Sequence, residues 1–359
     1  MRRRLALLLL LCGLVLAARV QAADHAAVLL YHHVSDDTPP STSASPAVFR
    51  RHLDFLAAGG YTVLPLSRIL ATFEKGGSLP DKTVAITFDD AYQSVLDAAA
   101  PLLKKHGWPF TVFVSTQSID EGYHDYLSWD DLHKLIAAGA EIGNHSYSHA
   151  HLVRRLGGES PQQWHTRVAA DIQRAQQELH ERLGVTPVMF SYPYGEYDAD
   201  LQDIVGSLGY FGIAQQSGAV GEGFDRLEVP RYPMATNYED MQRFAVSVNS
   251  RPLPVSRVSA GPRIQTAGDS SRYRFAFDVA PGNFRLAQLA CYNSSTGARL
   301  TLNKQTIGGA TRLSMQLPDW GAGRRKINCT APAARDAGVF FWYSYLWLVK
   351  QADGSWYEE

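Results

Sequence analysis

The sequence of 359 residues predicts an α/β domain followed by a small all-β domain, and three observations support this prediction. Up to about residue 244, short apolar runs alternate with longer amphipathic runs, as in a parallel sheet whose strands are connected by helices. Residues 249–262 hold three prolines and show no helical pattern, which is typical of a linker. Beyond residue 262, short runs of alternating apolar and polar residues favour a β-sandwich-like domain.

Strands and helices of the first domain are predicted from residue type and from end signals. Buried strands are predicted where β-branched and aromatic residues form short runs between turn residues, at 84–88, 110–114 and 188–190. Helices are predicted from Ser45 to Gly59, from Ser128 to about Gly139 and over residues 162–183. Strands that alternate with helices predict a mostly parallel sheet, closed or nearly closed.

The second domain is predicted to be all-β, with strands at 273–279, 299–303 and 340–348. Its aromatic residues allow two interpretations, of which we prefer core packing because alternate residues of a strand face one side. The other interpretation is a set of stacking platforms for sugar rings, which would make this domain a glycan contact. The aromatic residues concerned are Trp320, Trp342, Tyr343, Tyr345, Trp347, Trp356 and Tyr357.

Residues 1–22 are predicted to be a secretory signal peptide. Arginines at 2–4 precede a 14-residue apolar run that is short for a bilayer span, and Val20 and Ala22 suit a cleavage site. We therefore expect an exported protein, periplasmic or extracellular, without a transmembrane anchor after cleavage. The rest of the chain has 30 basic and 35 acidic residues, a net charge of −5 that argues against nucleic acid as a partner.

These boundaries divide the chain into a signal peptide at 1–22, a first domain at 23–248, a linker at 249–262 and an accessory domain at 263–359. Cys291 and Cys329 both lie in the accessory domain. Export to an oxidising compartment favours a disulfide between them, and two separate buried thiols are the alternative.

Any histidine chemistry belongs to the stretch from His25 to His180, where all twelve histidines are found. Asp89 and Asp90 follow the strand at 84–88, and His145 and His149 follow a short strand-like run. Each pair alone is a weak signal, because adjacent aspartates often form a turn and histidines four residues apart are often unrelated to metals. Together, one Asp and two His form a three-ligand set with an open position for water, typical of hydrolytic zinc sites.

These motifs resemble those of the polysaccharide deacetylases with a NodB-homology domain, carbohydrate esterase family 4. The first two family motifs are similar to TFDD at 87–90 and HSYSH at 145–149. Three further segments are similar to other family motifs: YPYG at 192–195, VPRYP at 229–233 and VLLYHHV at 28–34. The resemblance implies a distorted (β/α) barrel and metal-dependent removal of acetyl groups from a glycan.

The resemblance also implies a role for each residue of the site. It makes Asp90, His145 and His149 the metal ligands. Zinc is the default metal, and cobalt, nickel or iron also suit two histidines and one aspartate.

A general base, its partner and an oxyanion donor follow from the same resemblance. Asp89 would take a proton from water, which requires an ionised carboxylate beside the metal. Arg231 would hold this carboxylate charged and oriented. The backbone N–H of Tyr194 would stabilise the oxyanion of the tetrahedral intermediate.

The general acid needs a separate assignment, because many family members use a late histidine and this chain has none in its last 179 residues. In the subgroup of poly-β-1,6-N-acetylglucosamine deacetylases from biofilm systems, the histidine of an early Tyr-His motif serves as the acid. Tyr31 and His32 match that motif, so we assign the acid to His32, with His33 as the weaker candidate. His124 and His151 remain open as alternatives.

The sequence thus predicts an exported, metal-dependent deacetylase of N-acetylglucosamine units, with the poly-β-1,6-linked polymer ahead of chitin or peptidoglycan. Two alternatives remain, hydrolysis of a non-glycan amide and a glycan-binding or scaffold protein whose enzyme domain has decayed.

Overall fold

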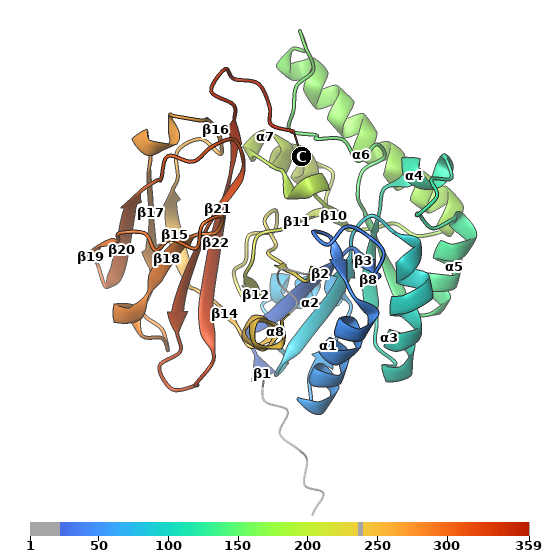
Figure 1. Cartoon of the computed structure of the whole chain (residues 1–359), viewed down its shortest axis with the longest axis horizontal. Helices are drawn as coiled ribbons and strands as arrows, with labels where there is room; N and C mark the ends of the chain where they lie inside the picture. Colours follow the sequence, from blue (N-terminus) through green and yellow to red (C-terminus); the bar gives the residue numbers. More distant parts are fainter. Residues whose placement is uncertain (1–21, 236–239, 359) are drawn as a thin grey trace, which may run out of the picture.

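The computed structural model describes residues 22–235 and 240–358, which form two domains side by side (Figure 1). Apart from Ala22, the predicted signal peptide lies outside these residues, so it stays a prediction. In the described ranges, no helix combines the length and apolarity needed to cross a membrane.

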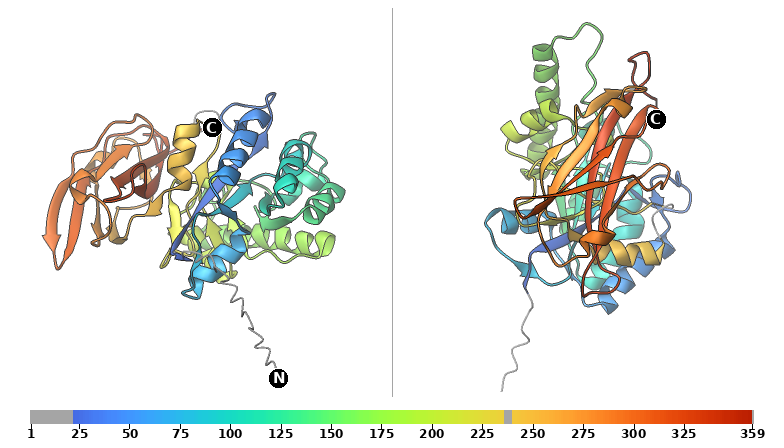
Figure 2. Two further views of the ribbon diagram at one scale, coloured as in Figure 1. Left: turned by 90° about the horizontal axis from the view of Figure 1, so that it is seen from below. Right: turned by 90° about the vertical axis from the view of Figure 1, so that its left-hand side faces the viewer.

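A curled nine-stranded sheet forms the centre of the first domain (Figures 1 and 2). Its order is β11-β10-β9-β8-β7-β2-β12, with β5 beside β7 and β13 beside β2. Strand β12 pairs antiparallel with β2, and the other pairs in this sheet are parallel. The strands are β2 His25–Tyr31, β5 Thr62–Val63, β7 Thr83–Phe88, β8 Phe110–Val114, β9 Ala140–Asn144, β10 Met189–Ser191, β11 Phe211–Ile213, β12 Ala219–Gly221 and β13 Tyr232–Pro233.

The segment 229–233 connects β11 to β2 across the open side of this sheet. Val229 forms a parallel bridge with Ile213 of β11, and β13 pairs with Leu29 and Leu30 of β2. The sheet is therefore a curled half-barrel whose gap is bridged by a short segment, which confirms the predicted distorted α/β barrel.

The helices cover the outside of the curled sheet (Figure 2), and those predicted from the sequence have the expected caps. Ser45 caps α1 through its hydroxyl, and Ser128 and Ser160 form capping boxes at α5 and α6. The predicted strand at 188–190 is observed one residue later, as β10, whose pairing with β11 begins at Met189, and Val188 is exposed. The helices are α1 Pro46–Ala58, α2 Leu66–Glu74, α3 Ala100–His106, α4 Thr116–Asp120, α5 Trp129–Ala137, α6 Pro161–Leu183, α7 Ala199–Ser207 and α8 Met241–Val248.

Two facing sheets form the second domain, of orders β14-β22-β21-β18, with β16 beside β22, and β15-β17-β20-β19. Their core holds Phe275, Phe277 and Trp347, and a disulfide joins Cys291 of β18 to Cys329 of β21, as predicted. The strands are β14 Arg251–Pro252, β15 Val255–Ser259, β16 Ile264–Thr266, β17 Arg274–Val279, β18 Ala290–Asn293, β19 Asn303–Ile307, β20 Ala310–Gln316, β21 Gly323–Pro332 and β22 Phe340–Lys350.

Two sequence-based expectations differ from this structure. Residues 249–262, expected to form a linker, contribute β14 and β15 to the two sheets, because prolines are tolerated at sheet edges. The strand expected at 299–303 begins only at Asn303, after a loop with Gly297 at a φ of 71°.

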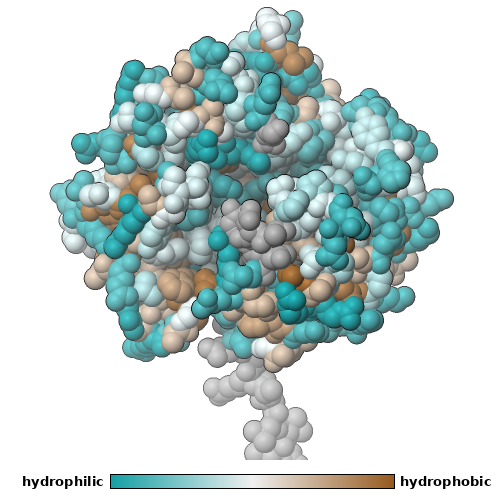
Figure 3. Space-filling view, in the orientation of Figure 1, coloured by the Kyte–Doolittle hydropathy of each residue, from teal (hydrophilic) through white to brown (hydrophobic). Residues whose placement is uncertain are grey.

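The seven aromatic residues considered in the sequence analysis are all buried or half-buried. Trp320 and Trp347 lie in the sandwich core, whereas Trp342 packs edge-on against Tyr232 of the first domain. In the view of Figure 3 the surface is mainly hydrophilic, with small scattered hydrophobic areas. Trp320 and Trp347 are thus core residues, as the preferred interpretation expected, whereas Trp342, Tyr343 and Tyr345 line a cavity between the domains. A glycan contact by this domain stays a prediction.

Candidate active site

The candidate residues gather where the parallel strands β7, β9 and β10 end. Asp89 and Asp90 directly follow β7, and His145 directly follows β9. Asp90 has a φ of 72°, in the left-handed region, so the chain turns sharply as soon as the strand ends. The carboxyl ends of parallel strands meet at one edge of a sheet, which is why residues 55 positions apart come together.

Asp90, His145 and His149 form a three-ligand cluster. The Nε2 atoms of His145 and His149 lie 3.3 and 3.1 Å from Oδ1 of Asp90, and the three ligand atoms lie within 4.8 Å of one another. Nδ1 of His145 donates to the carbonyl of Ser191 at 2.7 Å, which leaves the lone pair of Nε2 for a metal.

This donor set fits a divalent metal ion. Ligands at about 2.0–2.2 Å from a tetrahedral zinc lie roughly 3.3 Å from one another, close to the two distances from Asp90. Oδ1 of Asp90 is buried and accepts no hydrogen bond in the structure, which is costly unless a cation lies there. The cluster therefore holds the residues predicted as metal ligands in the arrangement that a metal requires.

Asp89 is bound by Arg231 in a fully buried, bidentate ion pair. Nη1 and Nη2 of Arg231 lie 2.7 Å from Oδ1 and Oδ2 of Asp89. The hydroxyl of Ser191 donates to Oδ2 at 3.1 Å. Burial by itself raises the pKa of Asp89, but the charge and hydrogen bonds of Arg231 outweigh burial, so the pKa lies below its usual value. Asp89 is thus ionised and fixed beside the cluster.

Arg231 is itself held on several sides. Its Nε donates to the carbonyl of Ala214 at 2.9 Å, and its Nη1 donates to the hydroxyl of Thr87 at 3.1 Å. Its guanidinium also lies over the ring of Phe113, 5.3 Å from the centroid. These contacts offset the desolvation of a buried charge and leave the guanidinium only one orientation.

Tyr194 lies in a tight turn after β10, next to the metal cluster. It has a φ of 58°, in the left-handed region that disfavours a residue with a Cβ atom. Its ring stacks on His151, with 3.9 Å between ring centroids, and lies 4.7 Å from the ring of His149. A tight turn is therefore present at the YPYG motif, beside a candidate metal ligand.

His32 and His33 follow β2, next to the aspartates. The backbone N–H of Asp89 donates to the carbonyl of Tyr31 at 3.0 Å, which places His32 beside the site. Burial lowers the pKa of His32, and the negative charges of Asp90 and Asp89 oppose this effect. Burial also lowers the pKa of His33, to about 4, and the ring of His33 stacks on Tyr92.

The two remaining histidine candidates differ in position. His151 is 24% exposed, donates to Glu196 at 2.9 Å and stacks on Tyr194. The side chain of His124 is 99% exposed and pairs with Asp125. His151 therefore borders the site, whereas His124 lies at the surface.

Sequence reasoning missed several residues that support the site. Ser191 contacts both Asp89 and Arg231, and its place directly before the YPYG motif could have indicated a role. Glu196 directly follows the same motif. Arg324, which contacts Tyr194 from the second domain, carries no signal in the sequence.

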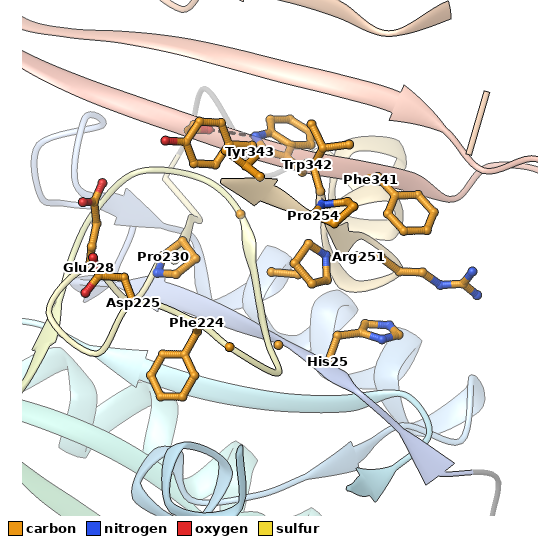
Figure 4. Close-up of a pocket in the computed structure, with 18 of the residues that line it drawn as sticks. His25, Phe224, Asp225, Glu228, Pro230, Arg251, Pro254, Phe341, Trp342 and Tyr343 are labelled. Atoms are coloured by element: carbon orange, nitrogen blue, oxygen red, sulfur yellow. Dashed lines mark hydrogen bonds between the residues drawn. The ribbon is translucent and has the colours of Figure 1, made fainter. Parts of the chain in front are cut away.

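A cavity of about 1120 Å³ lies between the two domains, away from the metal cluster. Figure 4 shows Phe341, Trp342 and Tyr343 on one side, and Phe224 and Glu228 on another. Among the described residues that line it, none is a candidate metal ligand. The chemistry is therefore expected at the strand ends rather than in this cavity.

Comparisons with known proteins find relatives of the first domain. Residues 76–213 match the family model described as polysaccharide deacetylase. The Bacillus subtilis protein YxkH, named as a polysaccharide deacetylase, is 27% identical over 172 residues, which span 48% of this chain and 58% of YxkH. A poly-β-1,6-N-acetyl-D-glucosamine N-deacetylase of Staphylococcus aureus is 24% identical over 194 residues, 53% of this chain and 67% of that protein.

Solved structures show the same fold. IcaB from Ammonifex degensii aligns with a TM-score of 0.53 and 26% identity over 60% of this chain and 94% of its own. The Streptococcus pyogenes deacetylase PplD aligns with a TM-score of 0.54 and 21% identity over the same shares.

Proposed function

Since residues 76–213 carry a polysaccharide deacetylase domain, we propose that this protein removes N-acetyl groups from N-acetylglucosamine units of a polysaccharide. The observation that carries the proposal is the Asp90, His145 and His149 cluster beside the buried pair of Asp89 and Arg231. A carboxylate that is ionised, oriented and close to a three-ligand metal site matches what amide hydrolysis needs.

A divalent metal held by Asp90, His145 and His149 would supply Lewis-acid chemistry, which would polarise the acetyl carbonyl and make a nearby water more acidic. Asp89 accepts the proton of the attacking water, and Arg231 keeps the carboxylate ionised for this step. The backbone N–H of Tyr194 donates to the oxyanion of the tetrahedral intermediate. His32 donates a proton to the leaving nitrogen as the carbon–nitrogen bond breaks, so the products are acetate and a free amine.

The substrate that we propose is poly-β-1,6-N-acetylglucosamine. It is supported by the early Tyr31-His32 motif and by the two named relatives, the staphylococcal deacetylase and IcaB. Chitin and peptidoglycan remain the alternative substrates. We also propose export, supported by the signal-like residues 1–22 and by the Cys291–Cys329 disulfide, which suits an oxidising compartment.

Acetate release from a panel of acetylated glycans, measured with and without a chelator, tests this function. We expect chelator-sensitive release that is fastest with the β-1,6-linked polymer and that returns when zinc, cobalt, nickel or iron is added. His149→Ala should lower both bound metal and rate, whereas the surface variant His124→Ala should change neither. No chelator-sensitive acetate from any glycan would contradict the function and favour a scaffold whose enzyme domain has decayed.

A further inference from the structure

One sheet of the second domain faces the first domain, which carries the candidate active site (Figures 1 and 2). In β22, Trp347 and Val349 point into the sandwich core, whereas Leu346 and Leu348 pack in a cluster with first-domain residues. Strand β21 pairs with β22 in register, and Arg324 lies opposite Leu348. Side chains alternate along a strand, so Arg324 lies on the face toward the first domain.

From this face, the second domain contacts the turn that carries Tyr194. Nη1 of Arg324 donates to the carbonyl of Tyr194. Two residues along β21, Nζ of Lys326 lies 3.5 Å from the carbonyl of Gln215. The side chain of Gln215 packs against Gly195, where an added Cβ would lie 2.7 Å from Cβ of Gln215. The neighbouring loops at Tyr194 and Gln215 are therefore both bound by β21.

Tyr357, near the C-terminus, contacts the same turn indirectly, through Glu196 and His151. The hydroxyl of Tyr357 donates to Oε1 of the buried Glu196, and Nη1 of Arg154 donates to the carbonyl of Tyr357 at 3.1 Å. Oε2 of Glu196 accepts a hydrogen bond from Nδ1 of His151 at 2.9 Å. The ring of His151 then stacks on the ring of Tyr194. The backbone of Tyr194 is thus bound through Arg324, and its ring through His151.

We infer that the second domain is a positioning part of the active site, which holds Tyr194 in its left-handed conformation through Arg324 and Tyr357. This inference rests on the proposed function of the Tyr194 N–H. Because a residue with a Cβ disfavours a φ of 58°, the turn relaxes when its outside contacts are lost. Relaxation turns the Tyr194 N–H away from the position of the oxyanion. A hydrogen bond to the oxyanion stabilises the transition state much more than the bound substrate, so its loss lowers the rate.

The test compares Arg324→Ala and Arg324→Lys with Arg325→Ala in the full chain. Arg325 is the matched control, because its side chain bonds to Gly321 and Ser295 within the second domain. We expect Arg324→Ala to lower kcat at least about 10-fold with little change in KM or bound zinc. Arg324→Lys should recover part of the rate, because an ammonium also donates to a carbonyl. An unchanged kcat in Arg324→Ala would overturn the inference.

Hydrogen exchange of the peptide that contains residues 193–196 gives a second readout, independent of activity. We expect faster exchange in Arg324→Ala and in Tyr357→Phe, and wild-type exchange in Arg325→Ala. Tyr357→Phe keeps the ring and removes only the donor to Glu196, so it serves if Arg324→Ala fails to fold. Wild-type exchange in a folded Arg324 or Tyr357 variant would overturn the inference. If the wild-type protein releases no acetate, the proposed function fails, and exchange still decides whether the second domain holds the turn.

Discussion

Both terminal nitrogens of Arg231 lie 2.7 Å from the two carboxylate oxygens of Asp89, and neither side chain is exposed to solvent. The two charges are 142 residues apart in the sequence and meet inside the curled sheet. Such a pair is costly to bury and more costly to break, because one charge would remain without its partner.

Asp89→Asn tests the base. The amide keeps the shape of the side chain but accepts no proton, so acetate release should fall at least about 100-fold. Bound metal should stay at the wild-type level, because Asp89 is not one of the three clustered ligands. Metal content and acetate release measured on the same sample check both expectations. Full activity in this variant would exclude Asp89 as the base.

Arg231→Met tests the buried pair. The carboxylate of Asp89 would be left without its partner, and the free energy of unfolding should fall by about 3–5 kcal/mol. Arg272→Met is the control, because Arg272 pairs with Asp269 at the surface, where a salt bridge contributes about 0–1 kcal/mol. Urea unfolding measures the free energy of unfolding of both variants. Equal decreases in the two variants would contradict a costly break of the buried pair.

His32→Ala tests the general acid. Removal of the proton donor should lower kcat about 100-fold or more and leave bound metal unchanged. His33→Ala is the matched comparison, because the neighbouring ring of His33 stacks on Tyr92 and its pKa is lowered to about 4. If His32→Ala keeps the wild-type rate while His33→Ala or His151→Ala loses it, the assignment moves to that residue.

Replacement of both cysteines by alanine tests the disulfide. The bond closes a sequence separation of 38 residues, and its loss should lower the free energy of unfolding by about 3–4 kcal/mol. Reductant should destabilise the wild-type protein by a similar amount and should not affect the Cys291→Ala/Cys329→Ala variant. Equal stability of wild type and variant in urea would contradict this prediction.

The lowered pKa of Lys326 predicts that the stability of the protein depends on pH. Burial between the domains lowers its pKa from 10.5 to about 8. Between these values the unfolded chain binds more protons than the folded chain, so this group makes stability rise with pH from about 8 to 10.5. Below pH 8 the destabilising contribution is fully present.

Unfolding of wild type and Lys326→Met at pH 7.5 and pH 9.5 measures this contribution. The wild-type protein should gain stability relative to the variant as the pH rises. The control Lys75→Met, at an exposed position, should follow the wild type at both values. A difference between wild type and Lys326→Met that does not change with pH would show that Lys326 remains charged when folded.

The sequence by itself determined the α/β class, the main helices and the short motifs that hold the candidate metal ligands and the candidate base. These features are local, since a capping serine, a buried strand and the residues after it lie within a few positions of one another. The predicted role of Arg231 came from the family resemblance, because no local pattern pairs it with Asp89, which lies 142 positions away.

Only the tertiary structure decided how the second domain meets the site. Strand β22 shows no simple apolar–polar alternation, because one face packs in the sandwich core and the other against the first domain. Its partner strand β21 brings Arg324 to the carbonyl of Tyr194, 130 residues earlier in the chain. Such contacts depend on how two folded domains dock. The interactions that determine docking are distributed over many residues, so no single sequence motif indicates them.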